Sequence, residues 1–171
     1  MTSIELLFDD ELERAVVDEW HQLEAAGVPN QSRHTGATNR PHLTLIWADE
    51  GIPPAELPVG LAAKLPLEVR LGAPILFGAG KRGVILARLV VPTRELLELH
   101  SAVHTQHRAA TGIAPKTLPG QWTPHVTLSR GVPLEQLADA LSAIDPRAAL
   151  TGHLVSARHW DARTSTVTSL D

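Results

Sequence analysis

Two short stretches of this chain repeat one phrase. Pro41–Ala48 reads PHLTLIWA, and Pro124–Arg130 reads PHVTLSR. In both copies a histidine follows a proline, and an apolar residue, a threonine and a leucine come next. The copies start about 80 residues apart in a chain of 171 residues. A phrase repeated at this distance predicts two similar half-chains, each contributing one copy.

Each copy has the pattern of a short β-strand with one apolar and one polar face. Side chains alternate across a strand, so residues i and i+2 share a face. His42 and Thr44 therefore point to one side, and His125 and Thr127 do so in the second copy. A single copy is also typical of a structural strand, because threonine favours strands. Two copies at matching places favour a functional role.

The segments around the two copies alternate between helical and strand patterns. Apolar residues at helical spacing, with capping residues before them and glycine or proline after them, predict helices at 9–26, 53–64, 92–110 and 133–144. Short apolar runs predict strands at 3–8, 42–47, 67–77, 84–91, 125–129, 150–160 and 164–170. The glycine-rich segment 78–83 predicts the turn of a β-hairpin between two of these strands.

The order of these elements repeats along the chain. In the first half a helix, a loop, a motif strand and a second helix precede a strand pair, and the same series starts again at Pro92. This order predicts a pseudo-two-fold arrangement with one motif strand from each lobe. No linker-like segment separates the halves, so residues 1–171 are expected to form a single domain of two lobes.

Composition narrows the classes of function. Hydrophobic residues make up 43% of the chain and charged residues 20%, which excludes a disordered protein. The net charge of −4 argues against a long nucleic-acid duplex as partner and leaves a small anionic ligand or an RNA end. The chain has no cysteine, which excludes disulfides, thiolate nucleophiles and zinc–thiolate sites. It has no signal-peptide pattern and no long apolar run, so we expect a cytoplasmic location away from membranes.

The paired motifs suit phosphodiester chemistry if the two strands lie side by side. Histidine titrates near neutral pH, so a pair can supply one neutral base and one protonated acid. His42 and His125 would move protons on the two sides of one phosphorus. The hydroxyls of Thr44 and Thr127 would donate hydrogen bonds to the phosphate oxygens, where negative charge develops. This scheme needs no metal, because the imidazolium already supplies positive charge.

The duplicated motif resembles a known family, the two-histidine (2H) phosphoesterase superfamily. PHVTLSR in particular is similar to the second motif of its branch of bacterial 2′-5′ RNA ligases and cyclic nucleotide phosphodiesterases. The resemblance implies a bilobed α+β fold, with antiparallel strands lining a central cleft and helices outside. It implies a cofactor-free phosphodiesterase, with or without 2′-5′ ligase activity, acting on a nucleotide or an RNA end. It carries over His42, Thr44, His125 and Thr127 as the catalytic set. The chain has no tyrosine and two phenylalanines, so aromatic residues common around such clefts are scarce.

Several further residues are candidates for substrate binding. Trp122, three positions before His125, is a candidate to stack on a nucleobase. Arg130 is a candidate phosphate contact, although strict alternation turns it away from His125 unless a bulge intervenes. Arg40, with Arg33 and His34, lies in the loop before the first motif and could form a basic rim. By the same alternation, Trp47 is expected in the core.

Two other classes of function stay open at this point. A protein of the same fold could bind nucleotides or RNA ends without catalysis. The three histidines His100, His104 and His107 share an arc of one predicted helix at a spacing that metal sites use. No carboxylate or cysteine completes such a set, so a histidine metalloprotein is the weaker alternative.

Overall fold

The structure, a computed structural model, describes residues 1–33, 36, 38–52, 64–80 and 83–170. The helix expected at 53–64 therefore lies outside the described residues except for Lys64. His34 and the middle of the turn at 78–83 lie outside them too. Within the described ranges, no helix is long and apolar enough to cross a membrane.

One antiparallel sheet organises the described part of the chain, which contributes seven strands to it. They are β1 (Thr2–Phe8), β2 (His42–Ala48), β3 (Leu67–Gly80), β4 (Gly83–Val90), β5 (His125–Val132), β6 (Leu150–Asp161) and β7 (Thr166–Ser169). The order across the sheet is β2-β1-β6-β3-β4-β5, and β7 pairs with β6 beside this path. With its helices, this sheet confirms the expected α+β class.

The strand order is symmetric under exchange of the two halves of the chain. A pseudo-two-fold axis between β6 and β3 exchanges β2 with β5 and β1 with β4. The repeat therefore runs from β1 through β3 and from β4 through β6. The expectation that the repeated series starts again at Pro92 is wrong by one strand, because β4 holds the position beside β5 that β1 holds beside β2 in the first half. The β3–β4 hairpin, predicted correctly, joins the two halves rather than closing the first.

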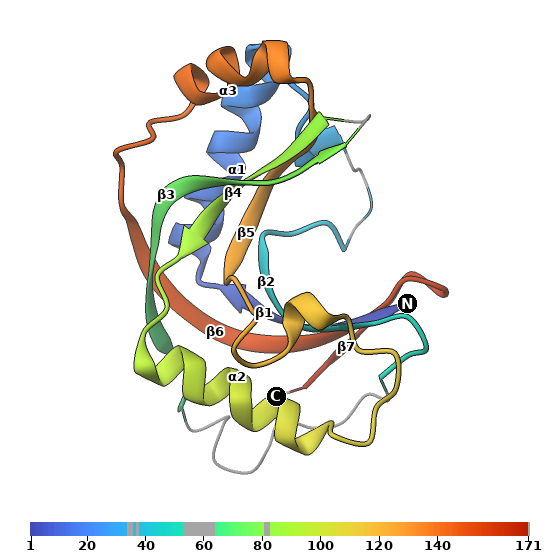
Figure 1. The fold of residues 1–171 in the computed structure, drawn as a ribbon. Coiled ribbons are helices and arrows are strands. Elements are labelled where there is room, and N and C mark those ends of the chain that lie inside the picture. Colours follow the sequence, from blue (N-terminus) through green and yellow to red (C-terminus); the bar gives the residue numbers. More distant parts are fainter. Residues whose placement is uncertain (34–35, 37, 53–63, 81–82, 171) are drawn as a thin grey trace.

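Helices cover the back of the curved sheet. Those of the described residues are α1 (Asp10–Ala25), α2 (Arg94–Gln106) and the shorter α3 (Leu137–Ala143). Both long helices are capped, since the side chains of Asp9 and Thr93 accept hydrogen bonds from Leu12 N and Leu96 N. Figure 1 shows α1 and α3 at one end of the molecule and α2 at the other.

Each long helix covers the motif strand of the opposite half. The helix α1 contacts β5 and β6 of the second half as well as β1 of its own, and α2 contacts β2. The predicted apolar face of α1, with Leu12, Val16, Trp20 and Leu23, is buried in the core. This exchange ties the halves together, because neither half can bury its own helix and sheet surface alone.

A buried ion pair joins α1 to β4 of the second half. The guanidinium of Arg88 on β4 is fully buried and forms an ion pair with Glu19 on α1. It also donates to the carbonyl oxygens of Gly72, Asp145 and Ala148. A buried charge needs this complete set of partners, because isolated charges are costly in a protein interior.

Candidate active site

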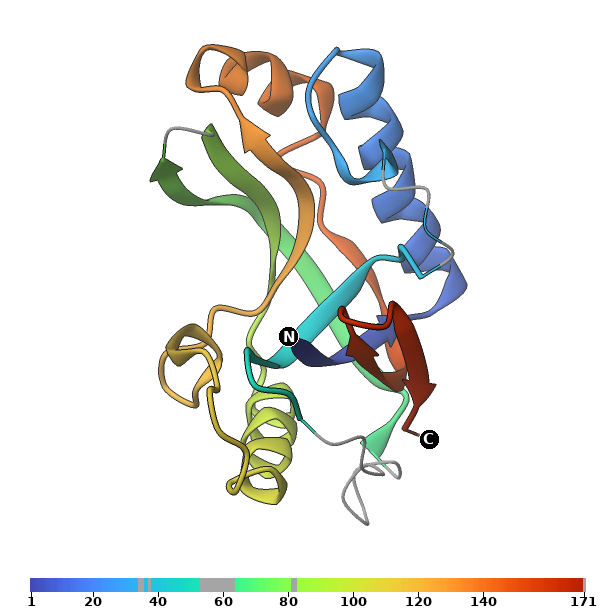
Figure 2. The same ribbon diagram turned by 90° about the vertical axis from the view of Figure 1, so that its right-hand side faces the viewer.

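The two motif strands contribute to one cleft on the concave side of the sheet. The cleft has a volume of about 980 Å³, and its lining includes His42, Thr44, His125 and Thr127. The strands lie close together without pairing, because they stand at opposite ends of the strand order. The curvature of the sheet brings β2 and β5 toward one another, as Figure 2 shows. The predicted faces are correct, because the alternating residues Leu43 and Val126 are buried behind them.

Both motif histidines are held in the same way. Nδ1 of His42 lies 2.7 Å from the backbone oxygen of Arg40, and Nδ1 of His125 lies 2.7 Å from that of Thr123. In each case the carbonyl is two residues earlier in the chain. A carbonyl oxygen accepts, so each ring carries its proton on Nδ1. Nε2 is therefore the nitrogen that can exchange a proton with a bound substrate.

A bulge follows each motif and changes which side chains reach the cleft. The register shifts between Ile4 and Glu5 opposite β2, and between Leu86 and Ala87 opposite β5. Each shift adds one residue to the motif strand after its threonine, which inverts the alternation beyond that point. Arg130 therefore lines the cleft, as expected for a strand in which a bulge intervenes between His125 and Arg130. Trp47 is turned in as well.

The expectation of a core position for Trp47 is wrong for that reason. Its ring is half-buried and lines the cleft, and the ammonium group of Lys116 lies 5.3 Å from its centre. Phe77, Trp122 and Trp160 line the same cleft. Tryptophan thus supplies most of the aromatic surface in a chain without tyrosine, and these rings offer faces on which a nucleobase can stack.

Indole N–H groups bind the free edges of both motif strands. Nε1 of Trp122 donates to the backbone carbonyl oxygen of Thr44 at 3.0 Å, and Nε1 of Trp20 donates to that of Thr127 at 3.1 Å. One ring face of Trp122 is stacked on His100, with ring centres 4.0 Å apart. Trp122 therefore has a structural bond to the first motif in addition to its place in the cleft lining.

The helical histidines lie behind the first motif strand. Nε2 of His100 lies 2.9 Å from the backbone oxygen of Thr117, and Nε2 of His104 lies 3.3 Å from the backbone oxygen of Leu45. Burial, together with the charge of the neighbouring His104, lowers the pKa of His100 to about 4. The described residues contain no group of three or more side chains suited to a metal ion. These contacts give His100 and His104 a role in holding the Trp122 loop and β2.

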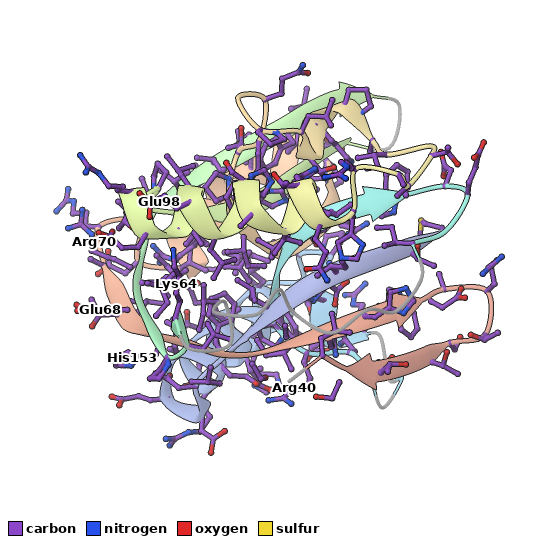
Figure 3. All side chains as sticks on the ribbon, turned by 90° about the horizontal axis from the view of Figure 1, so that it is seen from below. Arg40, Lys64, Glu68, Arg70, Glu98 and His153 are labelled. Carbon is purple, nitrogen blue, oxygen red and sulfur yellow. The ribbon has the colours of Figure 1, made fainter. Side chains whose placement is uncertain are left out.

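The side chain of Arg40 is not brought to the cleft lining. Its guanidinium pairs with Glu13 on α1, and this hydrogen bond raises its pKa. Figure 3 labels Arg40 at the lower border of the molecule, with Glu68, Arg70 and His153 on the outer side of the sheet. Of the proposed basic rim, Arg33 lines the cleft, whereas Arg40 contributes its backbone oxygen to His42.

A buried polar network beside His42 was missed by sequence reasoning. Glu5 on β1 accepts hydrogen bonds from Ser3 at 2.6 Å and from Arg158 on β6 at 2.8 Å. Its carboxylate lies 3.6 Å from Nε2 of His42. The signal in the sequence was a single acidic residue inside the apolar run SIELLF, two positions after Ser3. An acidic residue in a buried strand needs partners, which makes it a candidate for a site.

The surroundings of His125 are different. Burial lowers its pKa, and the positive charges of Lys116, Arg130 and His42 lower it further, against the opposing effect of the Thr123 carbonyl. The ring of Phe77 packs against it, with ring centres 4.5 Å apart. The neutral form of His125 is therefore favoured, which is the form that accepts a proton.

The model of a known family, the 2′-5′ RNA ligase superfamily, matches residues 8–170. The chain belongs to the 2′-5′ RNA ligase superfamily. This confirms the resemblance to two-histidine phosphoesterases that the duplicated motif predicted. Membership of the 2′-5′ RNA ligase superfamily supports a phosphodiester-directed activity of the two-histidine type.

Solved structures agree with this superfamily at the level of fold. The chain is similar to TT0787 of Thermus thermophilus, with 17% identity, a TM-score of 0.58, and 99% of this chain and 94% of that chain covered. It is similar to a protein described as a phosphoesterase, with 19% identity, a TM-score of 0.50, and coverage of 98% and 92%. No match was found among curated protein sequences.

Proposed function

We propose that this protein is a metal-independent phosphodiesterase that hydrolyses cyclic 2′,3′- or 2′-5′-phosphodiesters of nucleotides or RNA ends. The observation that carries the proposal is the duplicated anchoring of His42 and His125. Both rings bond a backbone oxygen through Nδ1 at 2.7 Å and line one cleft together with Thr44 and Thr127. An acid, a base and two oxyanion donors are the parts that this hydrolysis needs.

In the proposed reaction, the neutral His125 is the base and His42 is the acid. Nε2 of His125 takes a proton from water, and the water oxygen bonds to phosphorus. The bond from phosphorus to the departing ribose oxygen breaks, and Nε2 of His42 gives that oxygen a proton. Thr44 and Thr127 donate hydrogen bonds to the non-bridging oxygens, where negative charge grows. A 2′,3′-cyclic phosphate then yields a 2′-phosphate.

The cleft lining supports a small nucleotide or an RNA end as substrate. The cations Arg33, Lys116 and Arg130 are exposed around it and can attract phosphate groups. Trp47 and Phe77 offer rings for a base. A long duplex is disfavoured, because the net charge of −4 leaves little basic surface for a phosphate backbone.

His42→Ala and His125→Ala test this proposal directly. Each should lower turnover of a 2′,3′-cyclic nucleotide by about 10²–10⁴-fold, the usual contribution of a general acid or base. Turnover is measured with product identification by phosphorus NMR, which separates 2′- from 3′-phosphate. Retention of the wild-type rate by either folded variant would refute the shared-cleft mechanism.

Two controls separate the competing functions. His21→Ala, on α1, serves as a matched histidine substitution at an exposed position and should keep the rate. Activity should persist in EDTA, because the proposed reaction uses no cation. Loss in EDTA with recovery on adding zinc would favour a metalloenzyme. Tight nucleotide binding without turnover of 2′,3′-cyclic, 2′-5′ or RNA-end substrates would favour a non-catalytic binding module.

A further inference from the structure

The two halves of the cleft are alike at the motifs and differ beside them. The register pairs Thr44 with Glu5 in the first half and Thr127 with Ala87 in the second. Glu5 and Ala87 are therefore equivalent positions under the pseudo-two-fold. A carboxylate stands next to one motif, and a methyl group stands next to the other.

The difference continues on the next strand of the sheet on each side of the pseudo-two-fold axis. Glu5 pairs with Arg158 on β6, whereas Ala87 pairs with Ile75 on β3. The side of the cleft that carries His42 thus has a buried ion pair where the side that carries His125 has two apolar side chains. Any chemical difference between two otherwise equivalent histidines has its origin in such neighbours, because their own anchoring is the same.

Glu5 is held as an anion. It is 3% exposed, and burial alone would raise its pKa. The charges of His42 and Arg158 and the hydrogen bonds from Ser3 and Arg158 outweigh burial, so its pKa is lowered. The carboxylate is therefore ionised throughout the range in which histidine titrates.

The network also orients the charge toward His42. Arg158 donates from Nε to Oε2 of Glu5 and from Nη1 to the Thr38 oxygen. The other oxygen, Oε1, lies 3.6 Å from Nε2 of His42. The negative end of the pair thus faces the imidazole. At 3.6 Å this approach is longer than a hydrogen bond, so the carboxylate acts on the ring by its charge and leaves Nε2 available to the departing oxygen in the cleft that both side chains line.

We propose that Glu5 is a positioning residue whose carboxylate, held 3.6 Å from Nε2 of His42, makes this histidine the acid of the pair. This inference rests on the proposed function and adds the residue that assigns direction to it. Glu5 acts at His42, whereas burial and the charges of Lys116 and Arg130 act at His125, and both favour the same order. With Glu5, the leaving oxygen is the one bound beside His42, so one of the two possible phosphate products is favoured.

Other charged groups around His42 are part of the test. Glu5 approaches from β1, Arg158 stands behind it on β6, and His125 interacts electrostatically with His42 from β5. Glu5 and Arg158 have opposite signs, so their substitutions must act in opposite directions. A loss of packing would not produce opposite directions.

The experiment is an NMR titration of the imidazole signals of His42 in the wild type and three variants. Glu5→Gln should move the His42 midpoint to lower pH by about one unit or more, as expected for loss of an adjacent opposite charge. Arg158→Gln should move it to higher pH, because the charge of His42 and the hydrogen bond from Ser3 still favour the ionised form of Glu5, whose charge is then no longer opposed by Arg158. Glu5→Asp should restore most of the wild-type midpoint. An unchanged midpoint in Glu5→Gln, or shifts of the same sign in both Gln variants, would overturn the proposal.

Kinetics supply the functional readout. In Glu5→Gln the basic limb of kcat/KM should move to lower pH with the His42 midpoint, while the acidic limb stays in place. A shift of the acidic limb instead would show that Glu5 serves a base and would overturn its proposed role. If the wild-type protein turns over none of the substrates, the proposed function fails, and the NMR titration still decides whether Glu5 controls His42.

Discussion

The motif histidines show how a local sequence sets up a reactive group. The residue two positions earlier supplies its backbone oxygen to Nδ1 in both copies, at the same distance of 2.7 Å. This contact spans two residues, so the local backbone supplies it. It fixes which nitrogen faces the cleft without help from the rest of the molecule.

The motif threonines carry a prediction of their own. Thr44→Val and Thr127→Val remove one hydroxyl each and keep the branched shape of the side chain. Each should lower kcat by about 10–10³-fold, because one oxyanion donor is lost. Steady-state kinetics on a 2′,3′-cyclic nucleotide would measure this. Unchanged rates in both variants would show that the hydroxyls do not contact the phosphate.

Glu5 and Arg40 show the limits of a residue-by-residue interpretation. Arg40 is a cation next to the motif, yet its side chain pairs with Glu13 on α1. Glu5 is distant in sequence from both motifs, yet its carboxylate lies 3.6 Å from His42. Proximity in sequence identifies what the backbone can contact. It does not identify which side chains of neighbouring strands will share a face.

At the scale of secondary structure, both motif strands are edge strands of the sheet, and each contains a bulge. A bulge after each threonine turns Trp47 and Arg130 into the cleft. The strand edges are occupied by indole N–H groups, which bind the carbonyl oxygens of Thr44 and Thr127. These bonds satisfy edge groups that could otherwise pair with another strand.

The indole bonds can be tested by matched substitutions. Trp122→Phe and Trp20→Phe keep an aromatic ring and remove the N–H donor. Each should lower the free energy of unfolding by about 1–3 kcal/mol, the cost of leaving a carbonyl without its partner. Urea denaturation measures the loss. A cost below about 0.5 kcal/mol in both variants would show that these bonds do not hold the edges.

The whole molecule depends on an exchange of helices between halves. The helix α2 brings His100 and His104 against β2 and the Trp122 loop, and α1 brings Trp20 against β5. Both helices contact the motif strand across the pseudo-two-fold, so the cleft is complete when both halves are folded. Buried imidazoles in this interface make its stability depend on pH.

Acid should weaken the fold through these histidines. Burial is the main cause that lowers the pKa of His100 from 6.5 to about 4, and it also lowers those of His104 and His107. The unfolded chain therefore binds more protons between these pH values, so stability is complete above about pH 6.5 and is lost as the pH falls toward 4. For His100 alone the loss is about 3 kcal/mol.

Urea denaturation from pH 8 to pH 4 checks this dependence. His100→Gln removes the histidine whose pKa is lowered to about 4. The free energy of unfolding should therefore fall less steeply as the solution is acidified. The exposed His21→Gln is the matched control and should leave the slope unchanged. Equal slopes in wild type and His100→Gln would contradict a role for this buried imidazole.

Local patterns were enough to predict several features of this protein. The long helices, the hairpin and the polar face of each motif strand follow from periodicity and turn chemistry, which act over a few residues, whereas the α+β class was implied by the family resemblance. The duplicated phrase also indicated the family. These features are local in origin, so neighbouring residues are sufficient to specify them.

The tertiary structure decided the rest. The symmetric sheet set the boundary between halves, its bulges turned Trp47 and Arg130 into the cleft, and its curvature united two strands that do not pair. The pairing of β1 with β6 joined Glu5 to Arg158 beside His42. Register and curvature arise from contacts between segments far apart in the chain, and a pattern read along one segment does not contain them.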